Sequence, residues 1–409
     1  MSINRIAFIA LWLFIFSMPW ERAVAIPGVG GAGTMFGLVA FAAGAAAVFQ
    51  GGKLKARVPS LFMILFAFFV FWTGLSFFWA INPDGAQTRF QSFLQFLIMM
   101  WLIWELCRTH GRRLSLLQAY VWGSYVVIAM VIYNFVANPF VPTEDQNLYR
   151  YTGINDNPNS VATLIALGIA MSWYLAMNYR RGWRHWTFVA YVPLSLMAIG
   201  LIASRGGMLC AVVALALIPL SYGSLSVTRR VVLTLLIGVV SVVGISAIPQ
   251  TNLERLSETG QEITEGNVSN RAQIWEAGFV AFWESPFIGI GAGGYSDAVE
   301  RVRGFGGASH SAYFAVLTEL GLIGFVLFGL LLVVPVLPLF KLNYLDRTFY
   351  FVLWFAILVA FIPGSLQTYK VPWFLMALFT THRAYVVLPS SVSLARRRNV
   401  QSPQPQLEA

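Results

Sequence analysis

Long runs of apolar residues, without polar alternation, repeat along most of the chain. Each run is about 18 to 22 residues long, close to the ~20 residues with which an α-helix crosses a hydrocarbon core of ~30 Å. Strands of a membrane barrel would alternate apolar and polar positions instead. The pattern predicts an all-α polytopic membrane protein of about twelve transmembrane helices. The predicted spans are residues 5–20, 34–50, 60–80, 91–107, 114–136, 160–179, 186–204, 208–225, 231–249, 312–339, 348–363 and 371–388.

The first span and the last two spans are less regular than the others. The first run ends in Met18, Pro19, Trp20 and Glu21 without a small-residue cleavage pattern, so we expect a retained span rather than a signal peptide. In the last two spans, prolines and a lysine leave room for a dipping loop. The chain then divides into residues 1–249 with spans one to nine, 250–311 as one large outer loop, 312–390 with spans ten to twelve, and 391–409 as a cytoplasmic tail predicted to be disordered.

Charge sets the orientation. Only 11% of residues are charged and 58% are hydrophobic, against roughly 25% charged in soluble domains. Basic residues stay on the cytoplasmic side of a membrane, and with the N-terminus inside, every inner segment but the first carries at least two of them. Both termini are therefore predicted to be cytoplasmic. The net charge of +10 reflects this topology and does not indicate nucleic-acid binding. The basic residues left outside are Arg22, Arg89, Arg150, Arg205, Arg255, Arg271, Arg301, Arg303 and Lys370.

Arg205 stands out among these outer cations. It lies in a short turn, Ile202–Gly207, between two apolar runs, so its guanidinium must sit at or below the membrane interface. An arginine there costs about 2.5 kcal/mol or more unless a cavity or counter-ion receives it. Guanidinium matches phosphate oxygens, which indicates an anionic lipid ligand such as a lipid diphosphate. For Arg22 and Arg255, simple tolerance in a long loop is the better interpretation.

Function tends to concentrate in long loops, and the outer loop 250–311 is the longest here. Its regularly spaced glutamates at 254, 258, 262 and 265 are typical of a solvated helix face rather than a metal site. The following stretch predicts an amphipathic helix lying flat on the membrane. One face of that helix carries Arg271, Trp275, Gly278 or Phe279, and Phe282. A glycine-rich connection, Pro286–Tyr295, allows close backbone approach.

His310 closes the loop and is the only histidine predicted to lie outside. Its neutral imidazole, with a pKa near 6.5, can accept a proton from an attacking hydroxyl. The alternative is a simple interfacial anchor. Glu319, deeper in the same span, requires a partner. Cys107 and Cys210 lie at opposite predicted ends of the membrane, so no disulfide is expected, and no metal-binding spacing or cofactor motif is found.

Taken in order, these motifs resemble the O-antigen ligase family, which shares its core with O-antigen polymerases and protein O-oligosaccharyltransferases. The likeness spans about residues 150–330. A histidine motif, a Ser-Arg-Gly turn, an arginine-containing helix and a Pro/Gly-rich loop carry it. Their residues are His310, Ser311, Gly321 and Gly324; Ser204–Gly207; Asn270–Trp275; and Pro286, Gly289, Gly291 and Tyr295. A weaker match is Tyr149, Arg150, Gly153 and Asn157–Asn159.

The resemblance implies a GT-C-like glycosyltransferase of the Gram-negative inner membrane. It would move an O-antigen glycan from undecaprenyl diphosphate to lipid A-core oligosaccharide on the periplasmic face. The implied reaction is inverting and independent of metals or cofactors. The catalytic residues would be His310, Arg205 and Arg271. Substrate-binding residues would be Arg150, Arg89, Gly206, Tyr295, Arg301, Arg303, Tyr313 and Lys370, supported structurally by Glu319, Gly321 and Gly324.

Alternatives stay open at this point. A polymerase would use another lipid-linked repeat as acceptor. The chain ends soon after its last predicted span, without an extra C-terminal domain, which favours a ligase over a protein O-oligosaccharyltransferase. A lipid-linked glycan transporter would show polar residues at mid-membrane and usually an inverted repeat, and neither is evident in the sequence.

Overall fold

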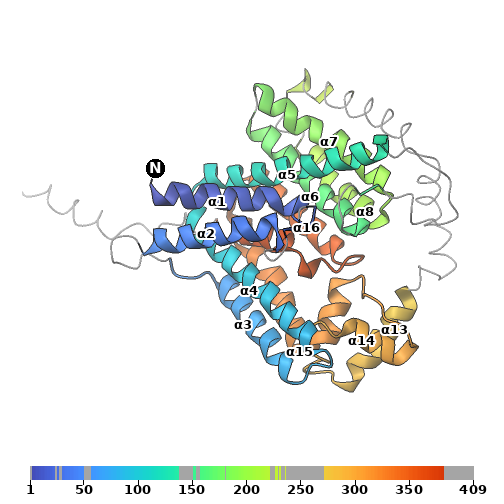
Figure 1. The fold of residues 1–409 in the computed structure, drawn as a ribbon. Helices are drawn as coiled ribbons and strands as arrows, with labels where there is room; N and C mark the ends of the chain where they lie inside the picture. Colours follow the sequence, from blue (N-terminus) through green and yellow to red (C-terminus); the bar gives the residue numbers. More distant parts are fainter. Residues whose placement is uncertain are drawn as a thin grey trace, which may run out of the picture.

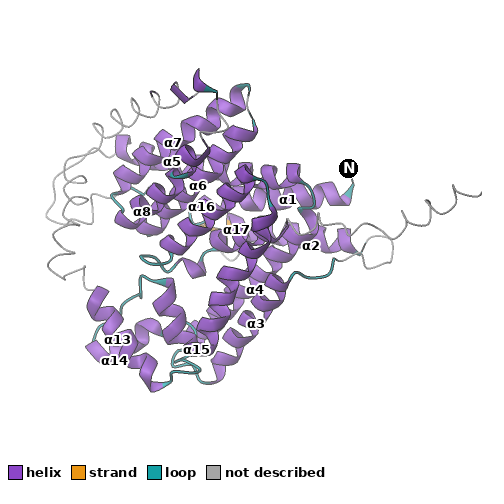
Figure 2. Ribbon diagram, turned by 180° about the vertical axis from the view of Figure 1, so that it is seen from behind, coloured by secondary structure: helices purple, strands orange, loops and turns teal. Residues whose placement is uncertain are grey.

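The computed structural model describes residues 2–23, 25–26, 30–49, 57–137, 151–152, 157–179, 181–221, 226–228, 230–231, 235 and 271–381. Apart from a two-residue antiparallel pairing of β1 (Ala25–Ile26) with β2 (Gly30–Gly31), the regular structure in these ranges is helical. Figures 1 and 2 show the helices packed side by side, with a smaller group at one end. The predicted all-helical class is confirmed for this part of the chain.

The helices follow the predicted spans closely. The α-helices are α1 (Ile3–Ser17), α2 (Ala32–Val48), α3 (Leu61–Leu75), α4 (Pro83–Leu106), α5 (His110–Ala137), α6 (Pro158–Asn178), α7 (Trp183–Ile202), α8 (Arg205–Leu215), α9 (Leu217–Ser221), α13 (Arg271–Glu284), α14 (Tyr295–Arg303), α15 (Ala312–Val333), α16 (Tyr344–Ala360) and α17 (Lys370–Thr380). Single turns or short runs of 3₁₀-helix extend them at η1 (Met18–Trp20), η3 (Ser76–Phe78), η6 (Val334–Lys341) and η7 (Leu366–Thr368).

Length and apolarity make this a polytopic membrane protein. Within the described residues, 6 helices are long and apolar enough to cross a membrane. Their bounds are Ile3–Trp20, Leu61–Phe78, His110–Ala137, Pro158–Asn178, Trp183–Ile202 and Ala312–Lys341. Shorter apolar helices occupy the predicted spans near residues 34–50, 208–225 and 371–388, and α4 and α16 occupy two more. The predicted span 231–249 lies almost wholly outside the described residues, so the count of twelve stays a prediction.

The centre of the bundle is α6, of which 94% of the apolar window is buried. Such a helix, apolar on every side, is typical of a core position. It packs against α5, α7, α8 and α16. The few polar side chains around it are satisfied by its backbone, since the hydroxyl groups of Tyr120 and Tyr191 donate to the carbonyls of Leu164 and Ile165. Cys107 and Cys210 are both buried and free.

The helices α13 and α14 form the smaller group beside α15 (Figure 1). The predicted apolar face of α13 is correct in part, but it packs against protein: Trp275 stacks on Phe314 of α15, with ring centroids 4.9 Å apart. Since α14 and α15 cover this face, it is not the one available to lipid. Of the two alternatives for the predicted face, Gly278 is buried, whereas Phe279 lies exposed together with Trp283. Contact of α13 with the membrane surface stays a prediction, and these two rings are its candidates.

Candidate active site

The long helix α15 is broken at Gly321, whose backbone has φ 66° and ψ −168°. A break inside a membrane span frees backbone groups that lipid cannot satisfy, so protein must pair them. The glycine-rich loop 285–294 does this through main-chain hydrogen bonds, and Trp72 of α3 donates its indole N–H to the carbonyl of Leu320 at 3.1 Å. The loop bonds join Ile290 N to Thr318 O (3.1 Å), Gly291 N to Glu319 O (2.9 Å) and Leu322 N to Pro286 O (2.9 Å).

Glycine is required on both sides of this contact. Gly289 and Gly321 have positive φ, 73° and 66°, a region that side chains disfavour. A Cβ added to Gly289 would overlap the backbone of Glu319, and one added to Gly321 would overlap the backbone of Phe287. The two glycine motifs seen separately in the sequence are therefore the two halves of one backbone interface. The supporting role of Gly321 stays a prediction, and this close backbone contact is its structural basis.

Glu319 finds its partners at the same place. Its carboxylate is buried and accepts hydrogen bonds from the backbone N–H groups of Gly293 and Tyr295. The guanidinium of Arg89, on α4, lies within electrostatic range of it. Glu319 thus holds the end of the glycine-rich loop and the start of α14 against the membrane helices. Arg89 therefore acts on this buried carboxyl group through its charge, and its predicted role in binding substrate stays a prediction.

The loop that carries His310 is fixed at both sides. Trp275 donates its indole N–H to the carbonyl of Ser309 at 2.7 Å. The hydroxyl of Ser309 lies 3.0 Å from that of Ser365 and donates to the carbonyl of Ser311 at 2.9 Å. Between these anchors His310 adopts a left-handed backbone, φ 49°, which is uncommon for a residue with a side chain. Surroundings that fix such a conformation are typical of functional positions.

The Ser-Arg-Gly turn is also built by local hydrogen bonds. Ala203 ends α7 with φ 52°, and Ser204 caps α8 by accepting from the N–H of Gly207 at 3.2 Å. Arg205 is thereby the first residue of α8. The next residue, Gly206, lies against the ring of Pro363, since an added Cβ would be 3.0 Å from its Cγ. Segment 361–369 therefore touches both the Arg205 turn and, through Ser365, the His310 loop.

Arg271 lies within electrostatic range of residues from two other segments of the chain, Arg205 and His310. Burial lowers the pKa of Arg271, and the nearby charge of Arg205 lowers it further. Burial also lowers the pKa of His310, with an added contribution from the charge of Arg271. The imidazole is therefore neutral at pH 7 and able to accept a proton. Two guanidinium groups near each other repel, and a bound anion would relieve this repulsion.

Several predicted substrate-binding residues already have protein partners. Arg303 pairs with Glu276 at 2.6 Å and joins α14 to α13, while Lys370 pairs with Glu21 at 2.5 Å. The hydroxyl of Tyr313 donates to Leu358 O (3.0 Å) and that of Tyr295 to Ile274 O (3.1 Å). Burial raises the pKa of Tyr295. Arg301 lies exposed on α14, Gly324 lies one turn beyond the break in α15, and Arg150 is outside the described residues.

Sequence reasoning missed the residues that support the site. Ser309 and Ser365 are far apart along the chain, and nothing in their neighbours marks them as partners. The amphipathic pattern predicts a membrane-facing position for Trp275, whereas its ring stacks on Phe314. The contact between the two glycine motifs could have been suspected from the sequence. Each motif places glycines where an ordinary helix or loop would accept any small residue, which indicates close backbone approach. Among the described residues, no group of three His, Cys, Asp or Glu side chains is placed to hold a metal ion.

Comparison with known proteins agrees with the resemblance. Residues 190–329 match the family model described as O-antigen ligase. No curated protein matches the chain. The matched range runs from α7 to α15 and contains Arg205, Arg271 and His310. The three residues whose charges interact thus all fall within the part of the chain that carries the family likeness.

Proposed function

We propose that this chain, whose residues 190–329 are an O-antigen ligase family domain, transfers an O-antigen glycan from undecaprenyl diphosphate to lipid A-core oligosaccharide. The family supports a membrane enzyme that transfers lipid-linked glycans. The observation that carries the finer proposal is that Arg271 lies within electrostatic range of both Arg205 and His310. Its two cations suit a diphosphate, and its neutral imidazole suits a hydroxyl acceptor.

His310 acts as the general base. It accepts the proton of the acceptor hydroxyl as that oxygen attacks the anomeric carbon of the glycan. The new bond joins this oxygen to the anomeric carbon, and the bond from that carbon to the diphosphate oxygen breaks. Attack opposite the leaving group inverts the anomeric configuration. The lowered pKa of His310 keeps the imidazole unprotonated and ready for this step.

Arg205 and Arg271 stabilise the departing diphosphate. Charge grows on its oxygens as the glycosyl bond breaks, and fixed cations nearby lower the barrier most when they face that growing charge. Guanidinium binds phosphate oxygens through two parallel N–H donors, which also orients the leaving group. No metal is required for this proposal, because the two arginines supply the positive charge.

The proposed membrane layout follows from the same chemistry. Twelve spans with both termini in the cytoplasm place the Arg205 turn, α13 and the His310 loop on the periplasmic side of the inner membrane. Residues 1–249 and 312–390 then form a GT-C-like membrane body, and 250–311 form its periplasmic loop. The positive-inside distribution of Lys and Arg supports this orientation.

Reconstituted enzyme tests the proposal. Wild type should transfer glycan from undecaprenyl diphosphate to lipid A-core in the presence of a chelator. We expect His310→Ala, Arg205→Ala and Arg271→Ala each to lower kcat/KM by about a hundredfold or more. Arg181→Ala, on the exposed inner side, is the matched control and should remain active. Full activity of the histidine variant would remove its assignment as base, and loss of wild-type activity in chelator would remove metal independence.

Strains without the gene separate ligase from polymerase. Loss of a ligase leaves core oligosaccharide without O-antigen, while the lipid-linked polymer accumulates. Loss of a polymerase leaves core capped by single repeat units. The second pattern would overturn the choice of acceptor without affecting the assignment of the site.

A further inference from the structure

The surface of α15 changes character at its break. Before Gly321 every residue of the helix is buried or half-buried, and α13 packs against this part. In a helix long and apolar enough to span a membrane, a stripe of exposed apolar side chains faces lipid. On α15 the members of such a stripe are Leu322, Ile323, Val326, Leu330 and Val333. All of them follow the break, so exposure to lipid begins at Gly321.

The length of this span also puts Gly321 near a membrane boundary. Ala312–Lys341 has 30 residues. A helix of that length extends roughly 45 Å, whereas the hydrocarbon core is only ~30 Å thick. The 20 residues Gly321–Phe340 are all uncharged, so they match the core by themselves. The preceding part, Ala312–Leu320, includes the buried Glu319 and then lies beyond the hydrocarbon. Gly321 therefore marks the edge of the hydrocarbon on that side.

The first turn of the glycine-rich loop lies beside the lipid-facing stripe at this edge. The carbonyl of Pro286 accepts from the N–H of Leu322 at 2.9 Å. The carbonyl of Phe287 accepts from the N–H of Ile323 at 3.2 Å. The side chains of Phe287 and Ile288 are themselves 67% and 36% exposed. The exposed apolar surface of the span therefore continues onto the loop.

The end of α13 adds two rings to this surface. Phe279 and Trp283 lie one helical turn apart, with ring centroids 6.0 Å apart, and are 44% and 65% exposed. Phe287 follows four residues after Trp283. Glu284, next to Trp283, is exposed as well. Because a charged group enters hydrocarbon only at high cost, these rings suit the membrane interface, where tryptophan side chains gather.

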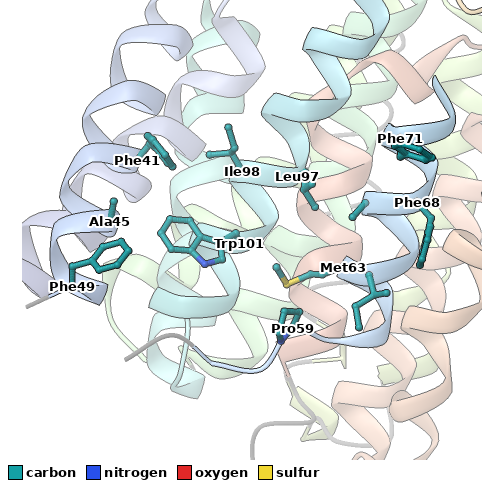
Figure 3. A pocket seen from close by; sticks show the side chains of 12 residues that line it. Phe41, Ala45, Phe49, Pro59, Met63, Phe68, Phe71, Leu97, Ile98 and Trp101 are labelled. Atoms are coloured by element: carbon teal, nitrogen blue, oxygen red, sulfur yellow. The ribbon is translucent and has the colours of Figure 1, made fainter. Parts of the chain in front are cut away.

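The neighbouring end of α3 is apolar and exposed too. The hydroxyl of Ser76 accepts from a backbone N–H of the glycine-rich loop at 3.1 Å, so η3 touches that loop. Phe77 and Phe78 are exposed there. Farther along α3, Phe68 and Phe71 are exposed beside the apolar groove among α2, α3 and α4 (Figure 3). Exposed apolar side chains thus follow both α3 and α15 as far as the loop.

We propose that Phe279, Trp283, Phe287 and Ile288 form one lipid-binding surface, which enters the membrane interface beside Gly321 and anchors α13 and the glycine-rich loop. The occupant is lipid, because the surface continues the lipid-facing stripe of α15. The inference rests on the proposed function only for the side of the membrane, which is the periplasmic one. Its consequence concerns the site: Arg271 begins α13, roughly 12 Å of helix before Phe279, so the anchor keeps that guanidinium close to the membrane surface.

Fluorescence quenching in proteoliposomes tests this surface. Full-length enzyme with Trp283→Cys or Phe287→Cys is labelled with a thiol-reactive nitrobenzoxadiazole dye, and the native Cys107 and Cys210 are buried. The bilayers, of phosphatidylethanolamine and phosphatidylglycerol, have either ordinary or brominated acyl chains. Brominated lipid should quench both labels, and iodide on both sides of the bilayer should quench them far less. Glu300→Cys, exposed on α14, is the matched control and should show the opposite pattern.

Each other outcome would overturn the inference. Labels quenched by iodide and not by brominated lipid would place the surface in water. Labels shielded from both quenchers would show that protein, such as a second copy of the chain, covers it. Unchanged melting temperatures in detergent show that the variants are folded, and Ile288→Cys supplies a third position on the same surface. Quenching needs no glycan transfer, so an inactive wild type would overturn the proposed function and leave this result standing.

Discussion

At the scale of single residues, the state of His310 sets the pH dependence of transfer. Its pKa is lowered by burial and by the charge of Arg271. Because the base form is the one above the pKa, transfer should lose rate only as pH falls through this lowered value, below about 6.5. Arg271→Gln removes one cause of the lowering, so the acidic limb of the residual rate should move to higher pH. Profiles of kcat/KM against pH measure this shift.

The control for that shift is Arg301→Gln. Arg301 is exposed on α14 and is not among the charges acting on His310. The acidic limb of the pH profile of Arg301→Gln should coincide with that of wild type. A limb at the wild-type position in Arg271→Gln as well would contradict the electrostatic contact between the arginine and the imidazole.

Ser365 should act as a positioning residue for His310. Its hydroxyl lies 3.0 Å from that of Ser309, the residue before the histidine. Removing one hydrogen bond of this kind costs about 1 kcal/mol, so Ser365→Ala should lower kcat about fivefold with little change in KM. Ser365→Thr keeps the hydroxyl and should restore most of the rate. Equal losses in both variants would indicate a packing role instead.

At the scale of elements, the break in α15 is the feature that holds the glycine-rich loop 285–294 against the membrane helices. Gly321→Ala would meet both a positive φ and overlap with the backbone of the glycine-rich loop. We expect destabilisation of about 2 kcal/mol or more, seen as a lower melting temperature in detergent. Gly329→Ala, in the same helix with open space around its Cβ, should be neutral or slightly stabilising. Equal melting temperatures for the two variants would contradict the proposed interface.

Periodicity and hydropathy predicted most of these elements correctly, because each span is defined by its own run of apolar residues. The predicted span 312–339 corresponds to α15 followed by η6, but its break at Gly321 was not predicted. The break is stable only because loop 285–294 pairs the freed backbone groups, and that is a tertiary contact which no local pattern contains. The predicted membrane-facing side of α13 packs against protein instead. An apolar face does not by itself reveal whether protein or membrane covers it.

At the scale of the whole molecule, the site is made by packing segments that are far apart in sequence. Arg205, Arg271 and His310 were found from the sequence, because charged groups and an imidazole on the predicted outer side demand an explanation. The proximity of these residues could not be predicted from the sequence, and neither could the pairing of Lys370 with Glu21. Both depend on how the helices pack, because long side chains meet across neighbouring helices. Segment 361–369, which contacts both the Arg205 turn and the His310 loop, carried no sequence motif.

A double-mutant cycle tests most directly whether Arg205 and Arg271 serve one diphosphate. The values of kcat/KM for wild type, Arg205→Ala, Arg271→Ala and the double variant give the interaction energy between the two sites. Two cations acting on the same leaving group should be coupled, so we expect the double loss to differ from the sum of the single losses by at least about 0.5 kcal/mol. Strictly additive losses would mean that the arginines act independently, and would contradict a shared site beside His310.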